Sequence, residues 1–382
     1  MKFSDFAGSW FTVFVFSLAT LFVATCPAQA QTGTVLYNFA GNPDGADPLS
    51  GLTFDGAGNL YGTTEQGGAH GAGAVFELSP NGGGGWNETV LYSFTGGADG
   101  RIPNGPVIFD SAGNLYGTAE YGGVYGYGVV FDLSPRGGRW TETVLYSFAG
   151  GADGGYPVSG LIFDPAGNLY GTSGRGVFEL SPSGGGWKEQ LIYAVGSIYG
   201  GLTMDVAGNI FGVGVSQVVY ELSPDGNGGW NSTVIYTFPG HHRHFVASTP
   251  VLDKAGNLYG VTSGSGGAGK VYRLSVGKKG LTEKTLYSVK TGGYLSLGIV
   301  LDAEGSIYGA TGVGGMYGAG TIFELVPSVG KGKYQEKVLW TFDGTDGELP
   351  VGSLILDNAG NLYGTTFGGG SYGDGVAFEV TP

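Results

Sequence analysis

The sequence is almost without cysteine, since Cys26 is the single one among 382 residues. It lies within an apolar N-terminal stretch, so the chain has no thiol after residue 30. Disulfide bridges, a thiolate nucleophile and a cysteine-ligated metal are therefore excluded from residues 31–382. The folded part must be stabilised by packing and by hydrogen bonds between strands.

Positive charge is also scarce. Lys and Arg number 17 against 31 Asp and Glu, which gives a net charge of −14 and a pI near 4.6. Nucleic acids and anionic membrane surfaces are held largely through Lys and Arg, so this composition disfavours both as partners. An acidic chain suits a soluble protein and is compatible with cation binding.

Glycine is abundant, at 80 residues, but it shows no three-residue period, which excludes a collagen-like chain. Hydrophobic residues make up 41% and aromatic residues 13%, and they recur in phase with the glycines. Disordered segments lack such material for a core. The composition therefore predicts a folded protein.

Long hydrophobic runs are missing after residue 30. Before it, Lys2 gives a positive end, residues 10–26 are uncharged and mostly apolar, and Ala28 and Ala30 supply small residues for cleavage before Gln31. This predicts a signal peptide over residues 1–30, and a mature chain that is secreted or periplasmic, with no membrane span. A lipoprotein signal ending at Cys26 is the alternative.

A nine-residue stretch, Asp55-Gly-Ala-Gly-Asn-Leu-Tyr-Gly-Thr63, organises the rest of the chain. It recurs in six further copies that begin at Asp110, Asp164, Asp205, Asp253, Asp302 and Asp357. Successive copies start 41 to 55 residues apart, and each unit contains four strand-like runs separated by turn residues, here called strands A to D. A period of about 50 residues with several short strands is typical of propeller blades. We therefore expect one all-β domain over residues 31–382, a seven-bladed β-propeller.

Each unit has small, turn-forming and strand-ending residues at the same positions. Small residues begin strand A, which suits seven strands converging on an axis. The Asp-x-x-Gly turn between strands A and B needs its aspartate as a cap, so the seven aspartates are expected to be structural. The glycine in strand B, such as Gly62, should let neighbouring sheets approach, and the Ser-Pro after strand C, such as Pro80, should end that strand.

The two ends of the folded part provide a further expectation. The mature chain begins with a lone D-type strand, Val35–Phe39, and ends with a C-type strand, Val376–Val380. The last unit thus lacks its own strand D. We expect the N-terminal strand to pair into the last blade and close the ring, which hides the sheet edges.

The repeated units Asp-x-Ala-Gly-Asn-Leu-Tyr-Gly-Thr-Thr, Gly-Gly-x-Tyr-Gly-x-Gly and Val-Phe-Glu-Leu resemble the GloVer tandem repeat of secreted bacterial choice-of-anchor proteins. The resemblance covers residues 34–382 and is strongest in copies 1, 2 and 7. It implies export and a propeller-like β fold. It implies no particular activity.

In a propeller the D–A and B–C loops emerge on one face, and long loops on a rigid scaffold usually carry binding groups. Two loop motifs recur on this loop face. Asp-Gly-x-x-Pro occurs in D–A loops at Asp44, Asp99, Asp153 and Asp346, and Gly-Gly-x-(His/Tyr)-Gly-x-Gly occurs in B–C loops at His70, Tyr125, Tyr317 and Tyr372. Carboxylates beside exposed rings are typical of a polar-ligand or sugar surface, so Asp99, Asp153, Asp346 and the four rings are the predicted ligand-binding residues. The alternative is that both motifs are good turns.

Three further groups of residues are candidates for metal binding or catalysis. No cofactor is expected; calcium is the one candidate, at Asp44 and Asp47 in the densest acidic loop. Glu65 and Glu120 occupy equivalent positions in two adjacent blades and could act as acid and base on a glycosidic bond. His242 lies in a loop with three histidines, at 241, 242 and 244, which could transfer protons or bind a metal.

The sequence favours a non-catalytic extracellular module that binds, or serves as a scaffold for, a glycan, peptide or protein. The alternative is an extracellular hydrolase or lyase with its site on the loop face, using Glu65, Glu120 or His242.

Overall fold

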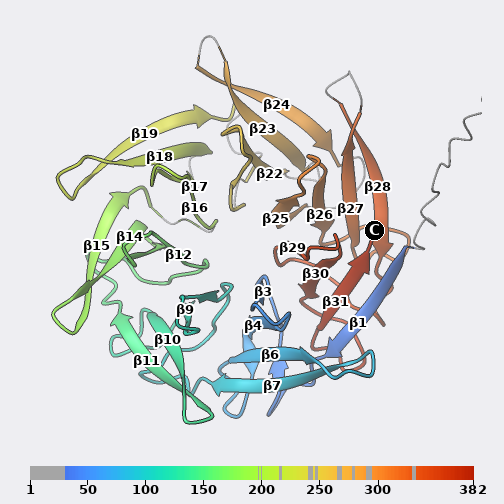
Figure 1. Cartoon of the computed structure of the whole chain (residues 1–382), viewed down its shortest axis with the longest axis horizontal. Coiled ribbons are helices and arrows are strands. Elements are labelled where there is room, and N and C mark those ends of the chain that lie inside the picture. The colour runs from blue at the N-terminus through green and yellow to red at the C-terminus, as the bar shows by residue number, and fades with distance from the viewer. Residues whose placement is uncertain are drawn as a thin grey trace, which may run out of the picture.

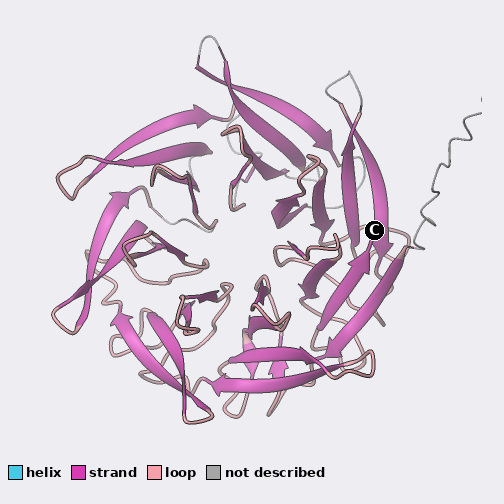
Figure 2. Cartoon of the chain, viewed as in Figure 1, coloured by secondary structure: helices cyan, strands magenta, loops and turns pink. Residues whose placement is uncertain are grey.

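The computed structural model of the chain is a ring of seven β-sheets around a central axis (Figure 1). It describes residues 31–382 except 197, 199, 215–216, 240–243, 246–247, 265–268, 278–279, 290–294 and 329–332. Strands and loops make up all of this described part (Figure 2). The predicted seven-bladed all-β propeller is confirmed.

Each blade has its strands A to D in order from the axis outwards (Figure 1). Blade 1 consists of β3 (Thr53–Phe54), β4 (Leu60–Thr64), β6 (Ala74–Pro80) and β7 (Trp86–Ser93). Blade 2 consists of β8 (Ile108–Phe109), β9 (Leu115–Ala119), β10 (Val129–Arg136) and β11 (Arg139–Ser147). Blade 3 consists of β12 (Ile162–Phe163), β13 (Leu169–Ser173), β14 (Gly176–Ser183) and β15 (Gly186–Ala194). Blade 4 consists of β16 (Thr203–Met204), β17 (Ile210–Gly214), β18 (Val218–Pro224) and β19 (Trp230–Thr237). Blade 5 consists of β21 (Val251–Leu252), β22 (Leu258–Gly264), β23 (Lys270–Gly277) and β24 (Gly280–Ser288). Blade 6 consists of β25 (Leu295–Leu301), β26 (Ile307–Thr311), β27 (Thr321–Pro327) and β28 (Tyr334–Thr341). Blade 7 consists of β29 (Ile355–Leu356), β30 (Leu362–Thr366), β31 (Val376–Thr381) and β1 (Thr32–Asn38). Three further strands, of two residues each, are not among the strands A to D. β2 (Gly45–Ala46) pairs with β5 (Gln66–Gly67), and β20 (His244–Phe245) pairs with β22.

The ring is closed by the N-terminal strand. β1 runs antiparallel to β31, with Thr34 opposite Glu379 and Val35 opposite Phe378. The blue and red ends of the chain lie side by side in Figure 1. The expected closure is therefore confirmed, and the last blade obtains its outermost strand from the other end of the sequence.

The repeated aspartate caps the A–B turn, as predicted. In blade 1 one oxygen of Asp55 accepts hydrogen bonds from the amides of Ala57 and Asn59, both at 2.8 Å. The other accepts from the Asn59 side chain at 2.7 Å and from the Tyr61 hydroxyl at 3.2 Å. Gly58 has φ +90°, which a residue with a side chain rarely adopts. The same backbone bonds recur at all seven turns.

Two details of the repeat differ from expectation. A Cβ on Gly62 would lie 2.6 Å from the Phe76 ring, so this glycine admits an aromatic ring of its own blade rather than a neighbouring sheet. Strand C does end at Pro80, as predicted, but the proline is the last residue of β6 and not the first after it, and it pairs with Trp86 in strand D. Strand B pairs with strand C only as far as Leu78, so the proline lies where no ladder hydrogen bond to strand B is needed.

The core lies between blades. The aromatic residue that follows strand D packs edge-on against the strand C ring of the next blade, as Phe94 does against Phe131 at 5.1 Å and Phe342 against Phe378 at 5.1 Å. Near the axis the small residues of strand A contact one another across blades, since a Cβ on Gly201 would lie 2.5 Å from Thr249 Oγ1. Large buried rings outside and small residues inside thus set the wedge shape of each blade.

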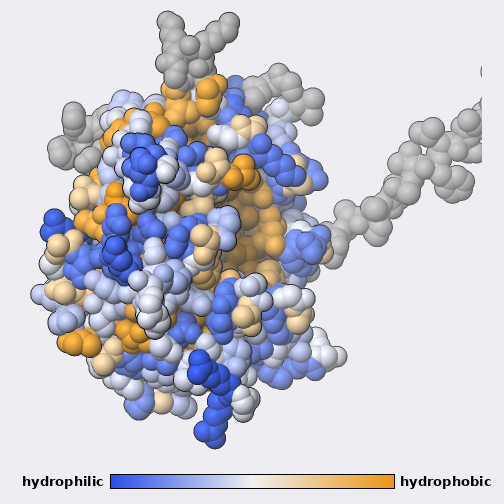
Figure 3. Space-filling model, turned by 60° about the vertical axis from the view of Figure 1, so that its left-hand side comes forward, coloured by the Kyte–Doolittle hydropathy of each residue, from blue (hydrophilic) through white to orange (hydrophobic). Residues whose placement is uncertain are grey.

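The outer strands are half exposed. From Arg139 to Val144 of β11 exposed and intermediate side chains alternate, as expected for a strand with one face towards the next blade. Figure 3 shows hydrophobic and hydrophilic side chains intermixed on the side of the ring that it presents. Among the described residues, no helix is long and apolar enough to cross a membrane.

Candidate functional site

Four B–C loops share one backbone design. In blades 1, 2, 6 and 7 the last glycine of the motif donates its amide to the carbonyl of the first: Gly73 to Gly67, Gly128 to Gly122, Gly320 to Gly314 and Gly375 to Gly369, at 2.9 to 3.2 Å. The carbonyl of that last glycine then accepts from the phenylalanine after strand D, as Gly73 does from Phe94 at 3.0 Å. The loop is closed on itself and tied to its own outer strand, so its tip is held in place.

Neighbouring loops are also joined to one another. The residue before the proline of Asp-Gly-x-x-Pro has a positive φ although it is not glycine: Asp47 at +56°, Ile102 at +58° and Leu349 at +56°. Its amide donates to the B–C loop of the preceding blade and its carbonyl accepts from the B–C loop of its own blade. Ile102, for example, donates to Ala72 O at 3.0 Å and accepts from Glu120 N at 3.1 Å. The loops of blades 6, 7, 1 and 2 therefore form one continuous arc.

The predicted rings lie at the tips of this arc. Tyr125, Tyr317 and Tyr372 are 61%, 63% and 66% exposed, and His70 is exposed as well. Two of the rings have an exposed aliphatic neighbour, Val124 beside Tyr125 and Met316 beside Tyr317. We call His70, Tyr125, Tyr317 and Tyr372 the ring arc. Sequence reasoning identified these residues but missed the backbone links between their loops.

The predicted aspartates accept hydrogen bonds from side chains of strand D and from backbone amides just after it. Asp99 accepts hydrogen bonds from the Tyr92 hydroxyl at 3.0 Å and from the amide and hydroxyl of Thr95 at 2.7 and 2.6 Å. Asp44 and Asp153 make the same pair of bonds, to Tyr37 and Ala40 and to Tyr146 and Ala149, and Asp346 accepts from the Trp340 indole at 2.8 Å. Each carboxylate thus braces its own D–A loop against strand D. The sequence signal for this bond is a Tyr or Trp six or seven residues before the aspartate.

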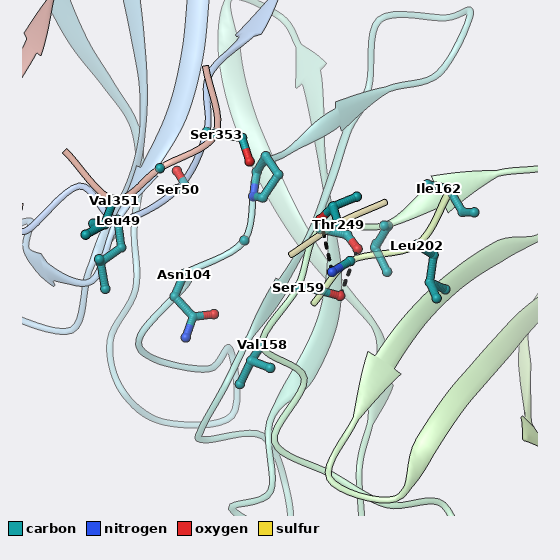
Figure 4. A pocket seen from close by; sticks show the side chains of 17 residues that line it. Leu49, Ser50, Asn104, Val158, Ser159, Ile162, Leu202, Thr249, Val351 and Ser353 are labelled. Carbon is teal, nitrogen blue, oxygen red and sulfur yellow. Dashed lines mark hydrogen bonds between the residues drawn. The ribbon is translucent and has the colours of Figure 1, made fainter. Parts of the chain in front are cut away.

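A cavity of about 160 Å³ lies on the axis where the A strands begin. Its wall includes Ser50, Asn104, Ser159, Thr249 and Ser353, most of which Figure 4 shows around a common space. The Thr249 hydroxyl accepts from Gly201 N at 3.1 Å, and Ser159 lies 2.7 Å from Thr172 Oγ1. Asn104 differs, because its buried Oδ1 has no partner within the described residues.

The two predicted glutamates lie in the B–C loops of adjacent blades, and one of them, Glu120, is linked to this cavity through Asn104. Asn104 donates its amide to Glu120 Oε2 at 3.0 Å. Burial raises the pKa of Glu65 to about 7, with further contributions from the negative charges of Asp47 and Glu120. Glu65 is therefore more readily protonated near neutral pH than an ordinary carboxyl group, and the charge of Glu120 lies close enough to contribute to this shift. Such a pair can in principle donate and accept a proton.

The remaining candidates stay open. His242 and its neighbour His241 lie outside the described residues, while His244 pairs with Gly264 as part of β20. Asp47 accepts from the Gln66 side chain at 2.5 Å, and Asp44 has both oxygens in hydrogen bonds. Within the described ranges no three His, Cys, Asp or Glu side chains gather as a metal-binding group.

Comparison with solved structures supports the fold. The chain is similar to the extracellular domain of BT4673 from B. thetaiotaomicron (11% identity, TM-score 0.57, 90% of this chain and 39% of that one). It is also similar to the WD40 propeller domain of Doa1 (15%, TM-score 0.58, 91% and 96%) and to YCF48, solved with a D1 peptide (12%, TM-score 0.57, 93% and 95%). The chain thus spans well under half of the first of these proteins. At such identities the likeness concerns the fold alone.

Among curated proteins none matches the sequence. The model of one repeat family, however, matches at residues 14–216 and again at 190–382. These two matches together cover almost the whole chain, and they agree with the repeat that the aspartate turns define. The protein belongs to the Gloeobacter/Verrucomicrobia repeat family.

Proposed function

We propose that this propeller is an exported binding module whose ring arc takes up a glycan, peptide or protein. The observation that carries the proposal is the exposure of the four rings on loops that share the same closing backbone hydrogen bonds. Single exposed apolar residues are normal on a protein surface, but here the same loop position carries an exposed ring in four adjacent blades. Exposed aromatic residues on a surface are common anchors for ligands.

Rigidity strengthens this argument. Ordering a loop on binding costs affinity, and a loop that is already ordered avoids that loss. The tip amides of Ala69 and Val124 are held by the side chains of Ser93 and Ser147 in strand D, and the amide of Ser371 is held by Asn38. The rings therefore stand on a preorganised surface that spans four adjacent blades, which suits an extended ligand.

Export is part of the proposal and rests on the signal-like features of residues 1–30. It predicts that the purified mature protein begins close to Gln31. N-terminal sequencing of protein recovered outside the cytoplasm tests this, and an intact Met1 on that protein would contradict it.

The binding role is tested with a glycan array and a random-peptide library probed with the purified chain. Ligands found in this way are measured again with the variant His70→Ala/Tyr125→Ala/Tyr317→Ala/Tyr372→Ala. We expect affinity to fall at least about tenfold, since single aromatic anchors commonly contribute more than 1 kcal/mol. Val206→Ser is the matched control, because Val206 is fully exposed at an A–B turn on the opposite face. Ligands that bind the fourfold variant as well as the parent would overturn the proposal, as would the absence of any ligand.

Acid–base catalysis is a second candidate function, favoured by the raised pKa of Glu65 and by the link of Glu120 to the axial cavity through Asn104. In this role Glu65 would donate a proton to the leaving oxygen, and Glu120 would act as the base that accepts a proton from the attacking water. A panel of chromogenic glycosides is the test. We expect Glu65→Gln and Glu120→Gln each to lower the rate by about 10²- to 10⁴-fold.

Glu88→Gln is the control for this experiment. Burial raises the pKa of Glu88 to about 7 as well, but Glu88 lies in the outer strand β7, away from the axis. If Glu88→Gln lowers the rate as much as Glu65→Gln does, the effect is one of stability and the catalytic assignment is wrong. A panel without any cleaved substrate also removes the assignment for glycosides.

A further inference from the structure

The ring arc lies in a strongly acidic surround. The D–A loops at 39–50, 94–105 and 342–352, and the B–C loops at 65–73, 120–128, 312–320 and 367–375, form this part of the loop face. Their acidic residues are Asp44, Asp47, Glu65, Asp99, Glu120, Asp343, Asp346, Glu348 and Asp374. Against these nine stand a single arginine, Arg101, and His70. Basic residues such as Arg136, Arg139 and Lys254 lie instead at turns of the opposite face.

Within the described part of the chain, none of the hydrogen bonds to these carboxylates comes from a charged side chain. Their hydrogen-bond donors are backbone amides and uncharged side chains, such as the Tyr37 hydroxyl on Asp44 and the Trp340 indole on Asp346. Such donors stabilise the charged form of a carboxyl group. Hydrogen bonds from the side chain and amide of Thr345 lower the pKa of Asp343, for example. The negative charge of Asp343, which is exposed on this face, is therefore available to a ligand at neutral pH.

Rings and carboxylates are near one another. Burial and the neighbouring Asp44 are the main causes that raise the pKa of Tyr37. Tyr372 also lies close enough to Tyr37 to raise this pKa electrostatically. In the same way, after burial and Asp153, Tyr125 lies close enough to Tyr146 to raise its pKa electrostatically. The Tyr146 hydroxyl donates a hydrogen bond to Asp153 at 3.0 Å. An exposed ring beside a charged carboxylate is a site for a cation, which gains both from the ring face and from the negative charge.

The fold contains one example of this recognition. The guanidinium carbon of Arg101 lies 5.0 Å from the centre of the Tyr121 ring, at the foot of the blade 2 loop. The exposed tyrosines of the ring arc have no such partner among the cation–ring contacts of the described residues. They offer the same interaction to a cation from outside.

From this juxtaposition we propose that the ligand of the ring arc is a cationic polypeptide segment, with its Lys or Arg side chains over the rings and against the surrounding carboxylates. The inference rests on the proposed binding function and narrows its ligand. Val124 and Met316 add exposed apolar contacts beside two of the rings, which suits a chain that mixes basic and aliphatic residues. An acidic glycan or peptide would be repelled, and a neutral glycan would gain nothing from the charge.

The test uses a synthetic peptide that alternates Arg and Ile, and a second peptide in which citrulline replaces every Arg. Binding to the purified full chain is measured by isothermal calorimetry at two salt concentrations. We expect the Arg peptide to bind at least tenfold more tightly than the citrulline peptide, and to weaken as salt rises because ions screen exposed charges. We expect Tyr125→Ala/Tyr317→Ala/Tyr372→Ala to weaken it at least tenfold.

A charge variant separates the carboxylates from the rings. Asp343→Asn/Glu348→Gln/Asp374→Asn removes three charges of the loop face with little change in shape, and should weaken the Arg peptide at least tenfold. Asp225→Asn/Glu304→Gln is the matched control, since both residues are exposed at turns of the opposite face, and should leave affinity unchanged.

The outcomes distinguish the two proposals. If the citrulline peptide or a neutral glycan binds through the rings as tightly as the Arg peptide, the cationic assignment is wrong and the binding function stands. If the Arg peptide binds but the ring variant leaves its affinity unchanged, the cation site lies elsewhere and the inference fails. If no ligand of any class depends on the rings, both proposals fall.

Discussion

Phe39, the first residue after the N-terminal strand, packs edge-on against Phe76 in the middle of blade 1, with ring centroids 5.0 Å apart. Both rings are buried. Phe39 thus follows the strand that completes blade 7 and at the same time packs into the core of blade 1. The closure of the ring depends on this contact as well as on the pairing of β1 with β31.

Replacing Phe39 by alanine should therefore destabilise the whole ring. Removing a fully buried phenylalanine typically lowers the free energy of unfolding by about 3–5 kcal/mol. Guanidinium unfolding followed by tryptophan fluorescence measures the change. Tyr125→Ala serves as the control and should shift the free energy by no more than about 0.5 kcal/mol, because its ring is exposed. A small effect at Phe39 would mean that the ring does not unfold as one unit.

Gly62→Ala should destabilise the fold by overpacking. The added Cβ would lie 2.6 Å from the Phe76 ring and 3.0 Å from Leu52. Such a clash in a packed core costs about 1–3 kcal/mol. Gly56→Ala in the same blade is the control, because a Cβ there meets nothing within 4 Å. Equal thermal midpoints for the two variants would contradict the assignment.

Asp110→Ala should lower stability by about 1–3 kcal/mol, because the amide of Asn114 and the Tyr116 hydroxyl lose their acceptor. Burial acts to raise the pKa of Asp110, but the hydrogen bonds from Asn114 and its neighbours outweigh burial and lower it. The contribution is therefore present above the unfolded value near pH 4 and is lost as pH falls through the lower folded value. The variant should lose less stability than the parent between pH 5 and pH 3, as measured by thermal melting.

Three outer-strand glutamates should give the opposite pH dependence. Burial, with the charges of Asp44, Asp99 and Asp153, raises the pKa of Glu88, Glu142 and Glu189 to about 7. A raised carboxyl pKa favours folding at low pH, and this contribution is lost as pH rises from about 4.5 to 7.

The variant Glu88→Gln/Glu142→Gln/Glu189→Gln should thus match the parent at pH 5 and be more stable at pH 8. Thermal melting at the two pH values tests this. Gln335→Ala, at an exposed and uncharged residue of β28, is the control and should leave the pH dependence as it is. A parent whose melting temperature is higher at pH 8 than at pH 5, with the same difference in the triple variant, would contradict the assignment.

Calcium should leave the melting temperature unchanged. Asp44 already accepts three hydrogen bonds, and Asp47 is held by Gln66. Calcium needs six to eight oxygen ligands, which these two residues do not supply. An upward shift at millimolar calcium that Asp44→Asn abolishes would establish the site after all.

The blades were predictable from the sequence because their determinants are local. Asp55, Gly58 and Asn59 specify a turn by themselves, and seven copies of that turn specify seven sheets. The pairing of β1 with β31 was predictable by counting strands. The role of Gly62 was not, because the residue that fills its space, Phe76, lies in a strand whose packing depends on the whole blade.

The candidate site was predictable only in part. The sequence by itself determined where the rings and carboxylates stand in the repeat, because each loop motif is contiguous. The tertiary structure decided that Ile102 links two blades, that Asn104 links Glu120 to the axial cavity, and that Asp99 accepts a hydrogen bond from Tyr92. The physical reason is that these contacts join blades or cross from strand to loop, so they exist only once the ring has closed.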